Sequence, residues 1–198
     1  EFADNGKYHC FPGFFAHTVG EQMRLFARCG VRGMFHCGYG QDVESYVTFK
    51  LMDDPTLDVD RLLDDYFGHL YVTAAEPMKQ LYLGIERVFC DPKNYPKEKA
   101  SGAALSWGHL GTEARMAEFA RLLERAKALA NDVESYAIFN LMFGPTLDSD
   151  AVRARIGLFE KAVWSYMVAG REQYLKRTSA AIPALKAPRV ADAGGDPA

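Results

Sequence analysis

The sequence lacks the features that mark membrane proteins and nucleic-acid-binding proteins. No stretch approaches the roughly 18 uninterrupted apolar residues that a membrane-spanning helix needs, and no basic amphipathic face predicts binding to a membrane surface. Lys and Arg do not outnumber Asp and Glu, and the formal net charge is -3 with a pI near 6.0. Without a basic surplus there is no attraction for a polyanion. We therefore expect neither a membrane nor a nucleic acid as a partner.

Cysteine is scarce, and its spacing has no pattern. The chain contains four cysteines, Cys10, Cys29, Cys37 and Cys90, with no CxxC pair and no framework of the kind that small disulfide-bonded domains use. Free Cys is among the most often buried residue types, so we interpret all four as small buried apolar residues. This usage neither establishes an oxidising compartment nor excludes one.

A histidine stands directly before a cysteine in the sequence at two places, which invites comparison with a metal site. His9 precedes Cys10, and His36 precedes Cys37. Zinc ligands come as pairs at fixed separations, whereas neighbours on a strand point to opposite faces. We therefore predict no metal site, and no motif implies a cofactor.

The two ends of the sequence differ in character. The chain opens at Glu1 in mid-motif, without an initiator Met or a signal-peptide pattern, which predicts a fragment of a longer protein whose N-terminal part is missing. With 198 residues, 48% of them hydrophobic, it can still bury a core. From Thr178 onward Ala, Pro and Gly dominate, so we expect residues 178–198 to be a disordered tail.

The N-terminal part of the chain is expected to contain a helix and then a strand. Apolar positions from Thr18 to Cys29 predict an amphipathic helix that ends at Gly30. The run from Val31 to Cys37, closed by Gly38-Tyr39-Gly40, predicts a buried strand and a turn. Together with a strand ending at Glu1, this would be the last unit of a (β/α)8 barrel, over residues 1–41.

The remainder of the chain predicts helices. Asp42 can cap a first helix that ends before Pro55, and Asp58 can cap a second. Further amphipathic patterns cover residues 73–90, 112–131 and 149–176. We therefore predict a mainly α fold, in which an α-helical domain over residues 42–177 follows the last strand and helix of a truncated barrel.

One segment resembles a known family. The stretch YVTFKLMDDPTLDVDRLLDDYF, followed by AAEPM, resembles the DUF4838 family, in which a K-L-x-x-D-P turn precedes D-V-D-x-L-L-D-x-[YF] and then A-A-x-P-M. That family is more distantly similar to the barrel and helical domain of α-glucuronidases and related glycoside hydrolases. The resemblance covers roughly residues 1–86. It implies that the substrate is a carbohydrate, and carbohydrates that bear uronic acid are among the candidates.

The same resemblance implies a catalytic residue at the start of the chain. Glu1, followed by Gly6, His9 and Pro12, is similar to a Glu-Tyr motif of α-glucuronidases, with Phe in place of Tyr. Glycoside hydrolysis needs two carboxyl groups that flank the scissile bond. Glu1 would be one of them, and its partner acid would come from the missing part. Asp4 and His9 would contact substrate, although Asp4 also suits a solvated turn.

Two further places have both a functional and a structural interpretation. Tyr39 and Gln41 would lie on the same barrel rim as Glu1 and contact a sugar, or Gly38-Tyr39-Gly40 would only form a turn. Trp107, near the end of a long loop over residues 91–111, would line a sugar subsite or anchor the loop on the helices.

The chain also contains an internal repeat. The segment DVESYAIFNLMFGPTLDSD at residues 132–150 closely repeats DVESYVTFKLMDDPTLDVD at residues 42–60, ninety positions apart. Because the flanking sequences do not repeat, a solenoid is excluded. Local duplication and convergence on one helix, turn and cap arrangement both remain open.

Two functions follow from these patterns. The first is the C-terminal fragment of a DUF4838-type, glycoside-hydrolase-like protein that hydrolyses glycosidic bonds when full length. The second is a non-catalytic helical accessory domain that packs against a barrel or a partner subunit. Under either hypothesis this chain alone should be inactive, and the helix at 18–29 and the segment after it should expose apolar surface where the missing neighbours pack.

Overall fold

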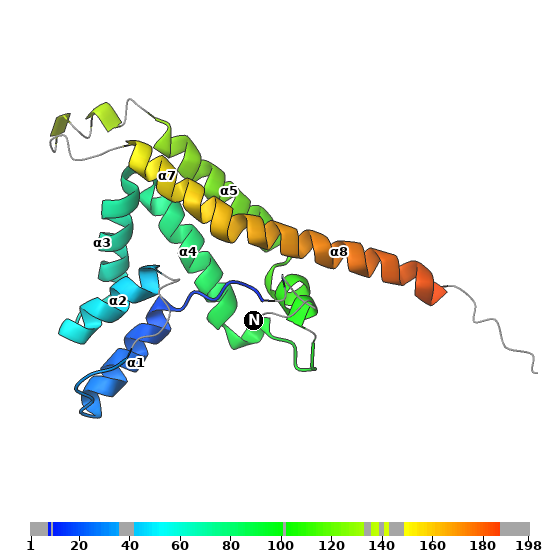
Figure 1. Cartoon of the computed structure of the whole chain (residues 1–198), viewed down its shortest axis with the longest axis horizontal. Coiled ribbons are helices and arrows are strands. Elements are labelled where there is room, and N and C mark those ends of the chain that lie inside the picture. Colours follow the sequence, from blue (N-terminus) through cyan, green and yellow to red (C-terminus); the bar gives the residue numbers. More distant parts are fainter. Residues whose placement is uncertain are drawn as a thin grey trace, which may run out of the picture.

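Helices make up all the regular structure that the computed structural model describes (Figure 1). The structure describes residues 8, 10–35, 42–100, 102–132, 136–138, 141–142 and 149–186, with side chains as far as residue 179. The principal helices are α1 (Ala16–Arg28), α2 (Asp42–Asp53), α3 (Val59–Tyr71), α4 (Ala75–Cys90), α5 (Glu113–Ala130), α7 (Ser149–Phe159) and α8 (Ser165–Lys186). The prediction of a mainly helical fold is confirmed.

Several helix ends follow from local sequence, as predicted. The Asp58 side chain caps α3 by accepting a hydrogen bond from the Arg61 amide at 3.0 Å. α1 ends in a Schellman motif, in which Gly30, with a φ of 76°, and Val31 donate their amides to the carbonyls of Ala27 and Phe26. Gly30 is needed there because other residues rarely adopt a positive φ.

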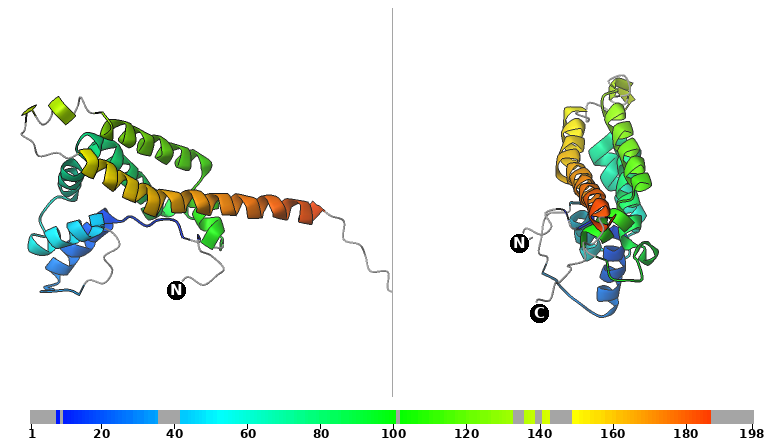
Figure 2. Two further views of the ribbon diagram at one scale, coloured as in Figure 1. Left: turned by 45° about the horizontal axis from the view of Figure 1, so that its top comes forward. Right: turned by 90° about the vertical axis from the view of Figure 1, so that its right-hand side faces the viewer.

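α4 lies at the centre of the bundle, with α3 packed on one side and α5 on the other (Figures 1 and 2). α7 packs against α5 and α3, and α8 continues from it through a π-helical turn, η4 (Glu160–Trp164). α1 and α2 pair with each other and project from the bundle below α3 in Figure 1. None of the helices in the described ranges is both long enough and apolar enough to cross a membrane.

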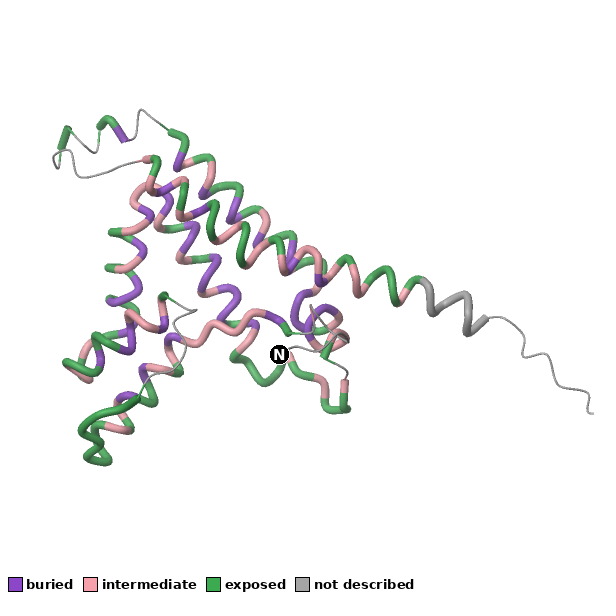
Figure 3. Tube along the Cα trace, in the orientation of Figure 1, coloured by how far each residue is buried: buried purple, intermediate pink, exposed green. Residues whose placement is uncertain are grey.

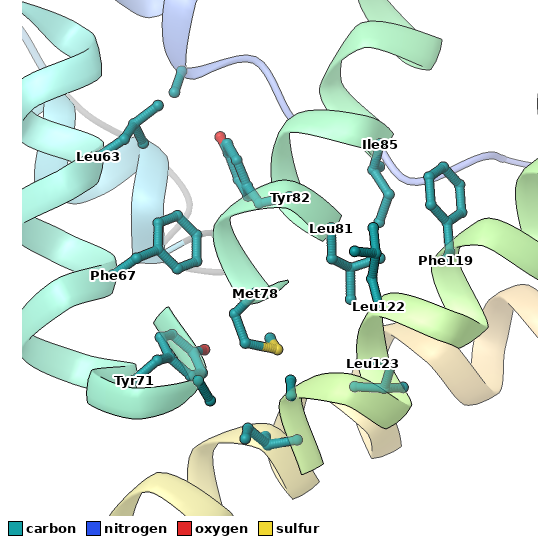
Figure 4. Close-up of a cluster of buried hydrophobic side chains, with 14 of the residues drawn as sticks. Leu63, Phe67, Tyr71, Met78, Leu81, Tyr82, Ile85, Phe119, Leu122 and Leu123 are labelled. Carbon is teal, nitrogen blue, oxygen red and sulfur yellow. The ribbon is translucent and has the colours of Figure 1, made fainter. Parts of the chain in front are cut away.

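The core lies on the two sides of α4 that face α3 and α5 (Figure 4). Leu63, Leu81 and Ile85 are fully buried, and Phe119 from α5 is 1% exposed. Figure 3 shows the same pattern along the trace, with buried positions on the inward faces and exposed positions on the outward faces. Side chains at spacings of three and four meet in this way when one face of each helix is buried.

α8 is longer than the sequence pattern suggests. The predicted tail begins at Thr178, whereas the helix continues to Lys186 and extends well beyond the bundle (Figure 1). Ala has the highest helix propensity, and Ala180 and Ala181 follow Thr178 inside the helix, which also contains Pro183. The predicted start of the tail is therefore wrong. Residues 187–198 lie outside the described residues.

The long loop over residues 91–111 contains helical turns, η2 (Pro92–Asn94) and η3 (Ala104–Leu110), and is anchored by Trp107. The Trp107 side chain is 0% exposed, and its ring carbons come within 2.4 Å of the position that a Cβ on Gly170 of α8 would occupy. Arg171 donates hydrogen bonds to the carbonyls of Trp107 and Gly111 at 2.7 and 2.8 Å. Because the ring is enclosed, the structural interpretation of Trp107 as the anchor of the loop is confirmed, and the alternative of a sugar subsite is wrong.

The buried strand predicted at Val31–Cys37 is not observed in the described residues 31–35. This segment has no regular structure, and Val31, Met34 and Phe35 are 47%, 37% and 87% exposed. A strand requires a neighbouring strand to pair its backbone groups, and the described parts of the chain provide none. An apolar run alone does not distinguish a buried strand from an exposed apolar segment.

Candidate functional site

The site residues predicted from the resemblance lie outside the described residues. These are the catalytic candidate Glu1 and the substrate-binding candidates Asp4, His9, Tyr39 and Gln41. All five therefore stay predictions. The structure instead shows three features that bear on function. They are a cluster of buried carboxylates, a cavity and an exposed apolar surface.

The buried carboxylates belong to Glu44 of α2 and Glu86 of α4, which are 4% and 5% exposed. Both accept hydrogen bonds from backbone amides at the start of α1, one of them that of the N-cap residue. Glu44 Oε1 accepts from the Phe15 amide at 3.0 Å, and Glu86 Oε1 accepts from the His17 amide at 2.9 Å. No side chain within α1 caps this end of the helix. Two neighbouring helices therefore supply the caps, and their negative charge suits the positive end of the helix dipole.

Two further side chains complete this cluster. The Tyr82 hydroxyl donates to Glu44 Oε1 at 2.5 Å. The His17 ring lies between two carboxylates, with Nδ1 at 2.8 Å from Glu86 Oε2 and Nε2 at 3.3 Å from Asp60 Oδ1. The cluster thus attaches α1 to α2, α3 and α4 at one point.

Burial and charge shift the protonation equilibria of this cluster. Burial raises the pKa of the Glu44 carboxyl, and the Glu86 carboxylate raises it further, while hydrogen bonds from Tyr82 and Phe15 oppose the rise. For His17 burial lowers the pKa, but hydrogen bonds and charge from Glu86 and Asp60 outweigh it, so the pKa lies above 6.5. Both groups therefore hold their protons more tightly in the folded protein.

A cavity of about 340 Å³ lies beside this cluster, between α2, α3, α4 and the α7–η4 segment. Its volume falls within the range of small-molecule sites. Figure 4 shows one part of its wall, where Phe67 and Tyr71 of α3 face Met78 and Tyr82 of α4. The wall is mostly apolar and aromatic.

Polar groups line the same cavity. Asp42 and Glu44 contribute carboxylates from α2, and Arg155 contributes a guanidinium from α7. Arg155 Nη1 donates to the Leu70 carbonyl at 3.1 Å. No carboxylate of the described residues lies within ion-pair distance of this guanidinium. Burial raises the pKa of the Tyr71 phenol to about 12, so it remains a donor at neutral pH.

The third feature is an exposed apolar surface at the far end of α1 and α2, which we call the apolar tip. It consists of Leu25, Val31, Met34, Phe35 and Met52, whose exposed fractions range from 37% to 87%. Val31, Met34 and Met52 line a hollow of about 320 Å³ between the ends of the two helices. The predicted exposure of apolar surface on the helix at 18–29 and the following segment is confirmed.

The described cysteines and histidines are not grouped as metal ligands. Cys10, Cys29 and Cys90 are free and exposed, so their predicted burial is wrong. Cys29 and Cys90 stand at helix ends, where a side chain has fewer neighbours than at a helix centre. Across the described ranges, no group of three or more His, Cys, Asp or Glu side chains is arranged to hold a metal ion.

Sequence reasoning missed Glu44 and Glu86, although a signal was present. Glu44 stands three, four and seven positions before Val47, Thr48 and Leu51, all of which are buried. A carboxylate in that stripe must be buried with it, and a buried carboxylate needs hydrogen-bond partners. The cavity had no such signal, because it depends on how α7 packs against α3.

The comparisons with known proteins identified no relative of this chain. No protein-family model matches this chain, and the searches of curated proteins and of solved structures found no match.

Proposed function

We propose that this chain is part of a glycoside-hydrolase-like, carbohydrate-active protein, and that the helical bundle is its C-terminal helical domain. Hydrolysis of glycosidic bonds would belong to the full-length protein, with Glu1 as one of its two carboxyl groups. The resemblance over roughly residues 1–86, which rests on the motifs at residues 46–78, suggests the family. The apolar tip is the observation that supports packing of the bundle against a barrel.

The apolar tip suits an interface better than free solvent. Apolar side chains scattered singly are normal on a surface, but a group around a hollow, such as Val31, Met34 and Met52, is typical of an interaction site. Met34 and Met52 are unbranched and adapt to the shape of a partner. Residues 31–35, which supply three side chains of the tip, join α1 to the segment where the barrel rim is predicted.

The catalytic part of this proposal has a direct test in the full-length protein. Glu1→Gln should lower kcat on an aryl glycoside by orders of magnitude while the melting temperature stays unchanged. Glu1→Asp serves as the companion variant, since it keeps the charge but shortens the side chain. Unchanged kcat in Glu1→Gln would remove this residue from the mechanism.

The second candidate function is a non-catalytic accessory domain, and the same apolar tip favours it. Under this alternative Phe35→Ser and Met34→Ser should weaken packing in the full-length protein but hardly change the stability of the isolated chain. Leu175→Ser, at a position that is 45% exposed on α8, is the matched control. Equal effects of tip and control variants would argue against an interface at the tip. A full-length protein with no glycosidase activity but a buried tip would select this second function.

A further inference from the structure

We propose that the cavity between α2, α3, α4 and the α7–η4 segment binds a neutral, hydroxyl-bearing ring compound of pyranose size. This site is distinct from the predicted barrel rim and does not depend on the proposed hydrolysis. Three observations support it, which are the aromatic wall, the polar groups at its edge and their balance of charge.

The wall suits a ring with an apolar face. Six aromatic side chains line the cavity, and they are Phe14, Tyr66, Phe67, Tyr71, Tyr82 and Phe159. A pyranose carries its C–H bonds on two faces and its hydroxyls around the edge, so a face can pack on an aromatic ring while the edge remains polar. The volume of about 340 Å³ accommodates one such ring with ordered water.

The edge of the cavity offers both donors and acceptors. Arg155 and the phenols of Tyr66 and Tyr71 are donors, and no hydrogen-bond partner for either phenol occurs among the residues that the structure describes. Asp42 and Glu44 are acceptors, and Glu44 is 4% exposed. A hydroxyl group donates one hydrogen bond and accepts others, so a polyol satisfies both kinds of group.

The charges at the edge disfavour an ionic ligand. An anion would pair with Arg155 but lie near the carboxylates of Asp42 and Glu44. A cation would pair with those carboxylates but lie near the guanidinium. Like charges in a partly desolvated cavity cost free energy. A neutral ligand avoids both costs and still offers hydroxyls to the donors and to the acceptors.

Titration followed by two-dimensional NMR of the whole chain tests this inference. The probes are D-glucose and D-xylose as neutral pyranoses, D-glucuronate as the anionic analogue, D-glucosamine as the cationic analogue and cyclohexanol as the apolar analogue. We expect saturable shifts for a neutral pyranose at the amides of Glu44, Tyr66, Tyr71 and Arg155, with a Kd of about 1 mM or weaker. The charged and apolar analogues should bind at least about fivefold more weakly.

Three variants test whether the ligand binds in the cavity. Ala162→Phe adds a ring at an exposed position that lines the cavity and should abolish the shifts, whereas Ala154→Phe, at an exposed position on α7 outside the lining, should not. The double change Tyr66→Phe and Tyr71→Phe keeps both rings and should weaken binding by about fivefold or more.

Three results would overturn the inference. One is the absence of saturable shifts for both neutral pyranoses. Another is tighter binding of glucuronate or glucosamine than of glucose. The third is binding that survives Ala162→Phe, which would place the ligand elsewhere. Loss of glycosidase activity in Glu1→Gln does not bear on any of these measurements, so the two proposals fail separately.

Discussion

The two copies of the repeated segment have nearly the same sequence but different environments. In the first copy Thr48 and Leu51 of α2 are 3% and 1% exposed, whereas their counterparts in the second copy, Ile138 and Leu141, are 60% and 86% exposed. α1 packs over α2, and the exposure of Leu141 shows that no described helix covers it in the same way. Burial of this segment is therefore imposed by its neighbours.

Unlike burial, the position at which the second helix starts is the same in both copies. α3 begins at Val59 and α7 begins at Ser149, ninety positions apart, so both copies start their second helix at the same place. In each copy the helix follows a Pro-Thr-Leu-Asp sequence. In the first copy α2 ends before Pro55 and Asp58 caps α3, and both effects act over a few residues. Local signals thus operate in either environment.

The largest expected effect comes from truncating the equivalent leucines. Leu51→Ala should lower the free energy of unfolding by about 2 to 5 kcal/mol, because it leaves a cavity among buried side chains. Leu141→Ala should change it by less than about 0.5 kcal/mol, because the side chain is exposed. Urea denaturation of the two variants measures the difference. Similar losses would show that the second copy is covered.

The next largest effect on stability is expected from Glu44, which caps α1 and attaches it to the first copy of the repeat. Glu44→Ala would leave the Phe15 amide and the Tyr82 hydroxyl without their acceptor and should cost about 2 to 3 kcal/mol. Glu44→Gln keeps a side-chain oxygen at that place and removes a buried charge, so it should be far less costly at neutral pH. Thermal unfolding of both variants distinguishes them. A glutamine variant as unstable as the alanine variant would mean that charge is essential.

A smaller effect is expected from the contact between α1 and the start of α3. A Cβ on Gly20 would lie 2.5 Å from Val59 Cγ2. Gly20→Ala should therefore cost about 1 to 3 kcal/mol through overpacking. Gly157→Ala on α7 meets no atom within 4 Å, so it should stabilise the helix instead by up to about 1 kcal/mol. Urea denaturation measures both changes, and a neutral Gly20→Ala would show that α1 is free to shift.

The smallest expected effect is a dependence of stability on pH. Because the folded pKa of His17 lies above its ordinary value of 6.5, the protonated ring contributes stability fully below that value. This contribution is lost as the pH rises through the raised pKa. The melting temperature should therefore fall over this window in the wild type and less so in His17→Gln. His69→Gln, at an exposed position, is the control. An unchanged slope in His17→Gln would contradict the role of the His17 pair with Glu86.

The same contrast explains how much could be predicted from sequence. Helix boundaries at Gly30 and Asp58 depend on neighbouring residues and were predicted correctly. The strand at Val31–Cys37 was wrong in its described part because an apolar run does not reveal its partner. The cavity and the pairing of Arg155 with the Leu70 carbonyl depend on segments 85 positions apart, so no local pattern indicates them.

Hydrogen exchange at the two equivalent leucines tests most directly whether packing by α1 distinguishes the two copies. The Leu51 amide should exchange only through large-scale unfolding. The Leu141 amide should exchange through local opening, which has a much lower free energy. In Gly20→Ala the protection of Leu51 should fall toward that of Leu141. Equal protection of the two amides in the unaltered chain, or protection of Leu51 that is indifferent to Gly20→Ala, would contradict the account.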